Sequence, residues 1–323
     1  MKVVRSLDAL QPPPGGSVVT IGNFDGVHLG HREIFRRVVG KASTLGAAAV
    51  VLTFEPHPLR LLAPERAPLR INTPEEKVRL IEASCVDLLL VLPFDRALAR
   101  LPARAFVEQI LIERLALRSL VVGYDYAFGR NREGDLDFLR GMAQKHDFVL
   151  EVLPPIARGE VVYSSSRIRS LLQAGQVNDV VNVLGRHFTL DGIVVAGAAR
   201  GRQLGFPTAN LRTSKELLPK DGVYAVKVRW RDAVYDGVVN IGRRPTFPGA
   251  APSLEIHLLD FAGDLYGETL RIYFVERLRD ELRFATVGDL QAKVSEDIAA
   301  ARRLLTERTV IEYRDSLDCG LQT

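Results

Sequence analysis

Residues 22–31 have the sequence Gly22-Asn23-Phe24-Asp25-Gly26-Val27-His28-Leu29-Gly30-His31. The apolar run 17–21 precedes this stretch and predicts a buried strand, and the apolar residues of 32–41 follow it at helical spacing. A glycine-broken turn between a strand and a helix directs free backbone N–H groups and the positive end of the helix dipole toward an anion. Gly22, Gly26 and Gly30 let the main chain approach a ligand closely, and His28 and His31 can donate hydrogen bonds to phosphate oxygens. The stretch therefore predicts a nucleotide phosphate site.

The two histidines have other interpretations. They could be ordinary turn residues or a pair of metal ligands, but no third ligand with suitable spacing stands nearby, which disfavours a metal. Gly40-Lys41-Ala42-Ser43 superficially suggests a P-loop. Position 35 is Phe rather than Gly and Lys41 is followed by Ala, so we exclude that motif.

Length and composition limit the classes of protein. A chain of 323 residues is too long for one typical core, so we expect two domains. With 47% hydrophobic and 25% charged residues, the composition is that of an ordinary globular protein. The formal net charge of +4 is small and both signs are interspersed, which disfavours nucleic acid as a partner and suits small anionic substrates.

The cysteines and the N-terminus predict a compartment. Cys85 and Cys319 are far apart in sequence and form no C-x-x-C pair, so we expect neither a disulfide framework nor a zinc site, which fits a reducing cytosol. Lys2 and Arg5 precede no apolar signal region, and no apolar run approaches the roughly 20 residues that span a bilayer. We expect a cytoplasmic protein that does not act at a membrane.

Strands and helices are expected to alternate in the first half. Apolar runs predict strands over 47–54, 86–92, 118–123 and 148–153, and helical spacing predicts helices over 103–115 and 135–145. Thr73, Pro74 and Glu76 form the N-cap, first position and capping box of a further helix. This order implies a parallel sheet wrapped by helices, with ligands beyond the carboxyl ends of the strands. Chemistry is therefore expected in the loops 22–31, 54–58 and 123–129.

The pattern changes around residues 182–187. From Phe188 onward, runs with period two end in glycine or aspartate turns, at 223–228, 233–241, 253–260 and 269–275. These runs predict a small antiparallel barrel or sandwich, and an amphipathic helix over about 287–307 would pack across it. We expect the tail 316–323 to be loose.

Several ordered motifs carry a resemblance to a known family. The G-x-F-D-G-x-H-x-G-H stretch resembles the H-x-G-H signature of the nucleotidylyltransferase superfamily, in the form found in prokaryotic bifunctional riboflavin kinase/FAD synthetases. Further motifs similar to that family follow in order: Thr53-Phe54-Glu55-Pro56-His57-Pro58, Gly123 to Gly129 with Arg132, Ser164 to Arg169, Gly205-Phe206-Pro207-Thr208-Ala209-Asn210, Val239 to Phe247, and Leu254 to Phe261. The resemblance covers almost the whole chain.

The resemblance implies an α/β nucleotidylyltransferase domain with a Rossmann-like parallel sheet over residues 1–184. It assigns His28 and His31 to catalysis of adenylyl transfer. It implies ATP-binding residues Gly22, Asn23, Phe24, Asp25, Gly30, Ser164, Ser165, Ser166, Arg167 and Arg169. It implies flavin-binding residues Phe54, His57, Pro58, Tyr124, Asp125, Tyr126, Phe128 and Arg132. Tyr126 and Phe128 could equally be core residues, and the three serines could be an ordinary serine-capped helix start.

The resemblance also implies a riboflavin-kinase β-barrel with a terminal helix over residues 185–323. It makes Glu255 the catalytic base, whereas the strand pattern alone places Glu255 on the polar outside of a barrel. Thr208 and Asn210 offer hard oxygen ligands for Mg²⁺, although without the resemblance they would be interpreted as part of a turn. Gly201 and Arg202 belong to a glycine-rich segment that could bind ATP phosphates through backbone donors, and a structural loop would look the same.

The implied function is flavin cofactor synthesis in two steps. Riboflavin and ATP would give FMN, and FMN and ATP would give FAD, with Mg²⁺ required; a homo-oligomer is left open. Two alternatives also remain open: an enzyme with one active module, or a non-catalytic flavin-binding or storage protein. Tyr126 stands where the family usually has Phe, and Tyr163 where an aliphatic residue is usual. Lys293 stands where the family usually has Gln, which weakens the case for a flavin contact from the C-terminal helix.

Overall fold

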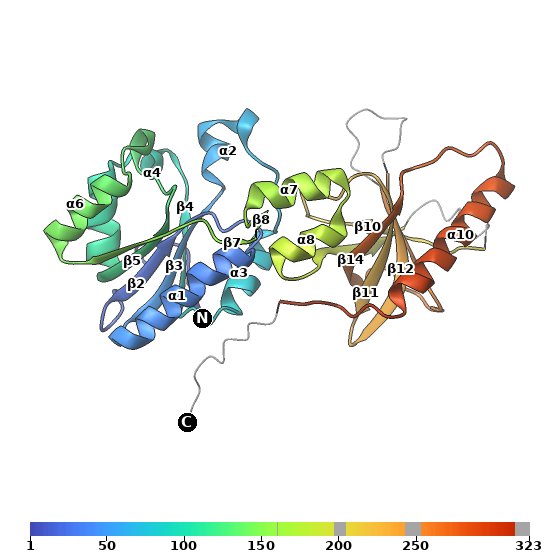
Figure 1. Cartoon of the computed structure of the whole chain (residues 1–323), viewed down its shortest axis with the longest axis horizontal. Helices are drawn as coiled ribbons and strands as arrows, with labels where there is room; N and C mark the ends of the chain where they lie inside the picture. The colour runs from blue at the N-terminus through green and yellow to red at the C-terminus, as the bar shows by residue number, and fades with distance from the viewer. Residues whose placement is uncertain (160, 197–204, 243–252, 314–323) are drawn as a thin grey trace, which may run out of the picture. The chain divides into compact units, whose positions relative to one another are not determined.

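The structure is a computed structural model that describes residues 1–159, 161–196, 205–242 and 253–313. Contacts divide the chain into two compact units (Figure 1). The first comprises Met1–Ser164 and the C-terminal stretch from Tyr313, and the second comprises Ser165–Glu312. The helical segment 165–184 therefore groups with the second unit. The domain boundary expected between residues 184 and 185 remains a prediction about the two catalytic modules.

The first unit contains a six-stranded parallel sheet in the order β1-β4-β3-β2-β5-β6. Its strands are β1 (Lys2–Val4), β2 (Ser17–Ile21), β3 (Ala48–Glu55), β4 (Leu88–Pro93), β5 (Leu117–Gly123) and β6 (Val149–Leu153). The parallel sheet confirms the expected fold class, with β1 as an additional edge strand. A short hairpin of β7 (Ala157–Arg158) and β8 (Val161–Val162) follows β6.

Helices connect the strands of this sheet (Figure 1). They are α1 (Leu29–Leu45), α2 (Pro58–Leu62), α3 (Pro74–Glu82), α4 (Arg96–Arg100), α5 (Ala103–Ala105), α6 (Leu136–His146), and the single-turn 3-10 helices η1 (Pro64–Arg66) and η3 (Arg130–Arg132). The predicted capping box of α3 is present, because Thr73 and Glu76 exchange side-chain to backbone hydrogen bonds. Beyond α5 the helix continues as η2 (Phe106–Arg114) with the wider hydrogen bonding of a π-helix, which the apolar spacing could not reveal.

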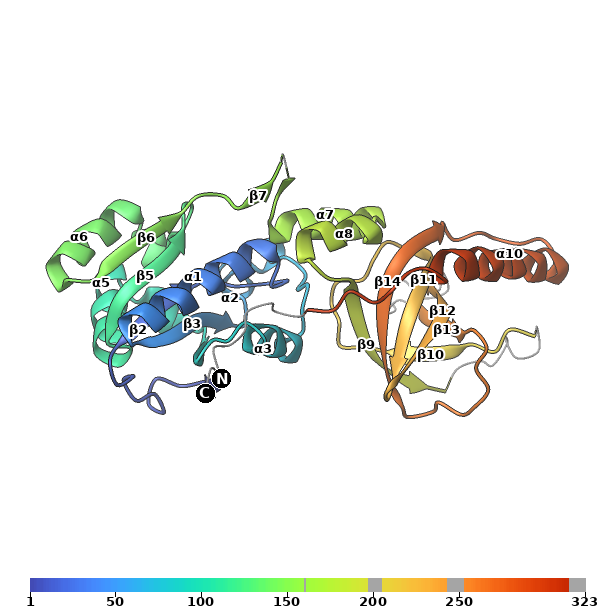
Figure 2. The same ribbon diagram turned by 60° about the horizontal axis from the view of Figure 1, so that its bottom comes forward.

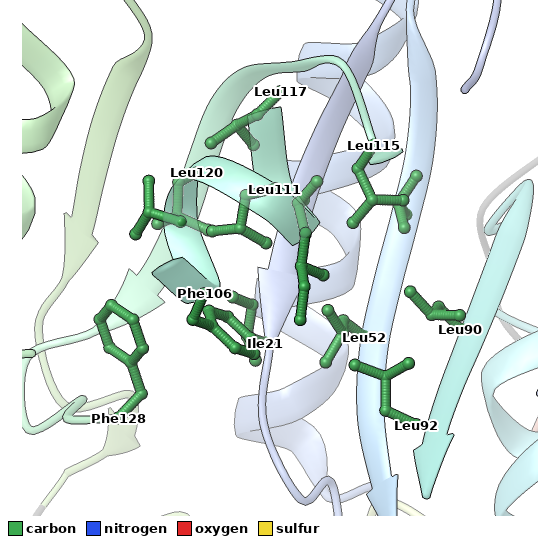
Figure 3. Packing of buried hydrophobic residues seen from close by; sticks show 14 of the residues in the cluster. Ile21, Leu52, Leu90, Leu92, Phe106, Leu111, Leu115, Leu117, Leu120 and Phe128 are labelled. Atoms are coloured by element: carbon green, nitrogen blue, oxygen red, sulfur yellow. The ribbon is translucent and has the colours of Figure 1, made fainter. Parts of the chain in front are cut away.

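The core lies on both faces of the sheet because successive strand residues point to opposite sides. On one face Ile21, Leu52, Leu90 and Leu92 pack under η2 (Figure 3). On the other face, neighbouring residues of β3 and β4 pack against Phe35 of α1 and other residues of α1 and α3. Burial on both faces explains why these strands appear in the sequence as continuous apolar runs.

The second unit begins with α7 (Ser165–Ala174) and α8 (Val177–Leu184) and continues into a closed antiparallel barrel. The barrel order is β10-β13-β12-β11-β14-β9. Its strands are β9 (Phe188–Val195), β10 (Ala209–Arg212), β11 (Gly222–Trp230), β12 (Ala233–Gly242), β13 (Ser253–Leu258) and β14 (Thr269–Arg279). Closure removes the exposed strand edges that an open sheet of this size would leave.

Helix α10 (Val287–Leu305) packs beside the barrel strands, as its amphipathic pattern predicts (Figure 2). Ala301 and Leu305 lie in a small core with Ala225 and Val275. Arg279 of β14 binds Asp297 of α10 through three side-chain contacts of 2.8, 2.9 and 3.1 Å, and both side chains are largely buried. A hydrophobic contact and a buried ion pair together fix this helix to the barrel.

Cys85 is disulfide-bonded, contrary to the expectation that the chain contains no disulfide framework. The other cysteine of the chain, Cys319, lies outside the described residues.

Candidate active sites

The order of the parallel strands places one loop of the first unit at a topological switch point. From β2 the chain proceeds to β3 and β4 on one side, then returns to β5 on the other side of β2. Ligands of open α/β sheets bind where the strand order reverses, beyond the carboxyl ends of the strands. The loop after β2 is the stretch 22–31, flanked by the loops that follow β3 and β5. The three loops selected from the sequence therefore meet at one edge of the sheet.

His28 and His31 are held together at the start of α1. His28 is the N-cap residue, and its Nδ1 accepts a hydrogen bond of 3.3 Å from the backbone N–H of His31. The two imidazoles are stacked, with 3.6 Å between their centroids, and Phe24 packs edge-on against His31 at 5.2 Å. His28 is buried, with 5% of its surface exposed. Both rings are thus fixed beside the positive end of the α1 dipole.

The surroundings of Gly30 and Phe24 explain why a glycine and a phenylalanine stand at these two positions of the turn. A Cβ atom on Gly30 would lie 3.1 Å from the His28 ring and 3.3 Å from the Cβ of Tyr163, so only glycine fits there without displacement. Phe24 is buried in a core cluster with Phe35. The side chain of Phe24 therefore supports the turn, and only its main chain is left for the expected contact with ATP.

A small pocket joins residues assigned to ATP and residues assigned to flavin. It is lined by Asn23, Asp25, Phe54, Glu55, His57, Arg70, Asn72, Pro74 and Lys77. The first two residues come from the expected nucleotide loop, and Phe54 and His57 come from the expected flavin loop. His57 caps α2 by accepting a hydrogen bond from the N–H of Leu59, so its ring has a fixed direction. The pocket places the two groups of residues at one site.

Five residues of that pocket were not selected as site residues from the sequence: Glu55, Arg70, Asn72, Pro74 and Lys77. Arg70 and Glu55 form an ion pair of 2.8 Å. Lys77 is partly buried, and burial lowers the pKa of its ammonium group against the opposing attraction of Glu55 and Asp25. Residues 70–77 precede or begin a helix, and no spacing in the sequence indicates that α3 brings them to the end of β3.

The predicted flavin-binding residues of the loop after β5 differ in exposure. Tyr124 is 52% exposed, whereas Phe128 is buried in the core against Phe106. Tyr126 stacks on Phe128 at 5.5 Å, and its hydroxyl is buried without a hydrogen-bond partner among the described residues. Burial raises the pKa of this phenol. Asp125, between Tyr124 and Tyr126 in the chain, and Arg132 of η3 are exposed.

The predicted motif Ser164 to Arg169 spans the boundary between the two compact units in the sequence. Tyr163 runs beside Gly30, so Ser164, the next residue, follows a point that is close to His28. Ser165, Ser166, Arg167 and Arg169 begin α7, which groups with the second unit. The contact of these four residues with the loop 22–31 remains a prediction.

In the barrel, one row of side chains crosses three neighbouring strands. Glu255 of β13 stands opposite Asn210 of β10 on one side and opposite Asn240 of β12 on the other. Directly opposed residues of antiparallel strands project from the same face, so the three side chains form a continuous polar row. Ser253 donates a hydrogen bond of 3.3 Å to Glu255. The alternate residues of β13, from Leu254 onward, are buried, so this row lies on the outer face of the barrel.

The segment leading into β10 is fixed beside that row. His257 Nδ1 contacts the carbonyl oxygen of Pro207 at 2.8 Å, and Phe206 packs edge-on against the His257 ring. Thr208 therefore follows an anchored residue and stands two positions before Asn210. The hydroxyl, amide and carboxylate oxygens of Thr208, Asn210 and Glu255 are a donor set that suits a hard divalent cation.

Other expectations fall outside these sites. Gly201 and Arg202 lie outside the described residues, as do residues 243–247 of the Val239–Phe247 motif. Lys293 forms an ion pair of 2.8 Å with Glu296 on the surface of α10. The described part of the chain contains no helix that is long and apolar enough to cross a membrane.

Comparison with known proteins gives a consistent result for both units. Residues 10–167 match a family model for FAD synthetase, and residues 184–305 match one for riboflavin kinase. A bifunctional riboflavin kinase/FMN adenylyltransferase from Pseudomonas fluorescens is 40% identical over 94% of this chain and 98% of its own length. The protein of the same description from Escherichia coli K12 is 38% identical, covering 94% and 97% of the two chains. The chain belongs to the bifunctional riboflavin kinase/FMN adenylyltransferase family.

A member of this family is a transferase with two activities. It phosphorylates riboflavin to FMN and adenylylates FMN to FAD, using ATP in both reactions, and ATP-dependent reactions of these kinds use a divalent metal. Among solved structures, one described as a macrolide-efflux protein from Streptococcus pneumoniae has a TM-score of 0.84 and 32% identity, covering 93% of this chain and 98% of its own. That description belongs to the pneumococcal protein, and the likeness shows that this chain and the pneumococcal protein share a fold.

Proposed function

We propose that the two reactions are divided between the two modules, with FMN adenylylation on residues 1–184 and riboflavin phosphorylation on residues 185–323. The observation that carries the proposal is the presence of two separate polar sites. One is the phosphate turn at the switch point of the parallel sheet, and the other is the row around Glu255 on the barrel. The separate matches to the FAD synthetase and riboflavin kinase models support the same division.

In the kinase reaction Glu255 acts as the base. Its carboxylate accepts the proton of the ribityl 5′-hydroxyl while that oxygen bonds to the γ-phosphorus of ATP and the bond to ADP breaks. Ser253 donates to the Glu255 carboxylate and orients it. Thr208 and Asn210 would hold Mg²⁺, with Gly201 and Arg202 at the ATP phosphates. When bound, the cation neutralises charge on the phosphate oxygens.

In the adenylylation reaction no strong base is required, because the nucleophile is the phosphate of FMN. A phosphate oxygen of FMN bonds to the α-phosphorus of ATP, and the bond to pyrophosphate breaks. The stacked His28 and His31 donate to oxygens on the α-phosphate and the departing pyrophosphate, where charge accumulates. The N-terminus of α1 adds its partial positive charge at the same point.

The remaining residues surround this reaction centre. Gly22, Asn23, Phe24, Asp25 and Gly30 form the turn that faces ATP, and Ser164, Ser165, Ser166, Arg167 and Arg169 supply donors to its β- and γ-phosphates. Phe54, His57, Pro58, Tyr124, Asp125, Tyr126 and Arg132 line the flavin side. Because Phe128 is in the core, its contribution is to support Tyr126 rather than to cover the ligand.

Two variants test this division of roles. Glu255→Gln keeps the size of the side chain and removes the base, so FMN formation from riboflavin should collapse while FAD formation from supplied FMN persists. His28→Ala should reduce FAD formation and spare the kinase. Glu296→Gln on the exposed side of α10 and His146→Ala on α6 are the matched controls. A Glu255→Gln protein that phosphorylates riboflavin at full rate would exclude Glu255 as the base.

The remaining expectations complete the proposal. We propose Mg²⁺ as the physiological cation, because the donor set is made of oxygens, and the cytoplasm as the compartment, because both reactions consume ATP. We propose that neither nucleic acid nor membrane is a partner. A homo-oligomer can be tested by light scattering.

A further inference from the structure

The turn that leads into His28 and His31 is held in an unfavourable backbone conformation. Phe24 has φ 47° and Val27 has φ 40°, values that side chains with a Cβ rarely adopt. Val27 is β-branched, which makes this conformation still less favourable. Such a turn persists only where surrounding contacts hold it. The residues that supply those contacts therefore decide where the two imidazoles lie.

Two contacts from the α3 region hold this turn. The buried carboxylate of Asp25 accepts hydrogen bonds from the backbone N–H groups of Ile71 and Asn72, at 3.0 and 3.2 Å. Within α3, the Nζ of Lys77 donates to the carbonyl oxygen of Asn23 at 3.3 Å. The turn is thus attached through a side chain at Asp25 and through its main chain at Asn23.

Lys77 also connects the turn to the end of β3. Its Nζ donates to Thr53 Oγ1 at 3.4 Å, and Thr53 Oγ1 donates to the same Asn23 carbonyl at 3.3 Å. Thr53 is fully buried and belongs to a strand, so it is a fixed reference point. Lys77, Thr53 and Asn23 form a closed triangle between α3, β3 and the turn.

An ammonium group at this place is costly unless it is compensated. Desolvation disfavours the charged form of Lys77, and the nearby carboxylates of Glu55 and Asp25 favour it, while Arg70 opposes it. An apolar side chain could fill the same space at lower cost but could not hold the Asn23 carbonyl. Packing alone therefore does not explain why a lysine stands at position 77.

We propose that Lys77 is a positioning residue for adenylyl transfer: from α3 it holds the Asn23 carbonyl against Thr53 and so fixes the turn that carries His28 and His31. This inference rests on the role proposed above for the two histidines. Lys77 acts through the turn and not on the reacting phosphates. Loss of Lys77 should consequently slow the chemical step more than it weakens the binding of ATP or FMN.

Lys77→Met tests the proposal, with Lys77→Arg as the conservative variant and Arg79→Met, an exposed position of the same helix, as the matched control. FAD formation from supplied FMN and ATP is measured for kcat and both KM values, and riboflavin phosphorylation by the same preparation reports on the barrel unit. We expect kcat for FAD formation to fall about 100-fold in Lys77→Met, the effect of a displacement of about 1 Å, with both KM values nearly unchanged. Lys77→Arg should recover most of the loss, and Arg79→Met should match the parent.

A spectroscopic readout tests position directly. The chain has 6 histidines, so their imidazole Cε1–H signals can be assigned by substitution. In Lys77→Met the signals of His28 and His31 should shift in the absence of substrate, and those of His187 and His257 in the barrel unit should not. Unchanged His28 and His31 signals, or a raised KM with kcat retained, would overturn the positioning role. A His28→Ala variant that keeps Lys77 and still forms FAD at the full rate would instead overturn the proposed phosphate site.

Discussion

Asp25 gives the most quantitative prediction about the first unit. Its carboxylate is 8% exposed and accepts the backbone N–H groups of Ile71 and Asn72, which immediately precede α3. Asp25→Ala leaves these two buried donors without that acceptor, and each such loss costs roughly 1–3 kcal/mol. We therefore expect the unfolding free energy of the first unit to fall by about 3 kcal/mol. For a unit of this size that corresponds to about 6–12 °C in Tm.

Asp25→Asn separates hydrogen bonding from charge. Asp25 Oδ1 accepts from both N–H donors at 3.0 and 3.2 Å, and an asparagine carbonyl can replace it, whereas the bond of 3.1 Å from Ile71 to Oδ2 is lost. The unfolding free energy should then fall by only about 1 kcal/mol, from the loss of charge and of this second bond to Ile71. If Asp25 also acts on the nucleotide, Asp25→Asn should lose FAD formation while it keeps most of its stability.

The assay can follow the two units separately. The chain has one tryptophan, Trp230, which lies on β11 of the barrel, so its fluorescence reports unfolding of the second unit. Far-UV circular dichroism follows both units, which is necessary because two units need not unfold in one transition. We expect Asp25→Ala to lower the dichroism midpoint and leave the fluorescence midpoint unchanged. Equal destabilisation by the alanine and asparagine variants, or a shift in both midpoints, would refute the reasoning.

Three further predictions concern other parts of the chain. Asp297→Ala removes the carboxylate that pairs with the partly buried Arg279, which keeps its hydrogen bond to the Asp280 carbonyl oxygen, so the barrel should lose about 2 kcal/mol by tryptophan fluorescence; an unchanged midpoint would contradict the ion pair's role. His187 accepts the N–H of Ile311 through Nδ1, and burial lowers the pKa of His187 from 6.5, so the folded barrel favours the neutral ring. Its stabilising contribution should be complete above pH 6.5 and decline as the pH falls toward the lower folded value; a His187→Asn barrel should have a flatter pH dependence of unfolding. Tyr126→Phe removes a buried hydroxyl that has no hydrogen-bond partner among the described residues, so the first unit should gain about 1 kcal/mol by circular dichroism, and a loss would reveal an unrecognised partner.

Much of the architecture follows from local patterns in the sequence. The continuous apolar runs predict strands buried on both faces, and period two after Phe188 predicts the barrel, because side-chain periodicity depends only on backbone geometry. The capping box at Thr73 and Glu76 is equally local, since its partners are three residues apart. His28 and His31 also lie within one helical turn, so their proximity could be predicted.

Tertiary structure decided what depends on contacts distant in sequence. Lys77 and Arg70 reach the pocket only because α3 packs beside the end of β3, and no spacing encodes that contact. The register of β12 and β13 places Asn240 opposite Glu255. A shift of this register by one residue would move the Asn240 side chain to the other face of the barrel wall. Phe128 belongs to the core and not to the ligand surface because its position against Phe106 is set by packing. The sequence by itself therefore determined the two folds and the reactive residue types, while packing and register determined which other side chains surround them.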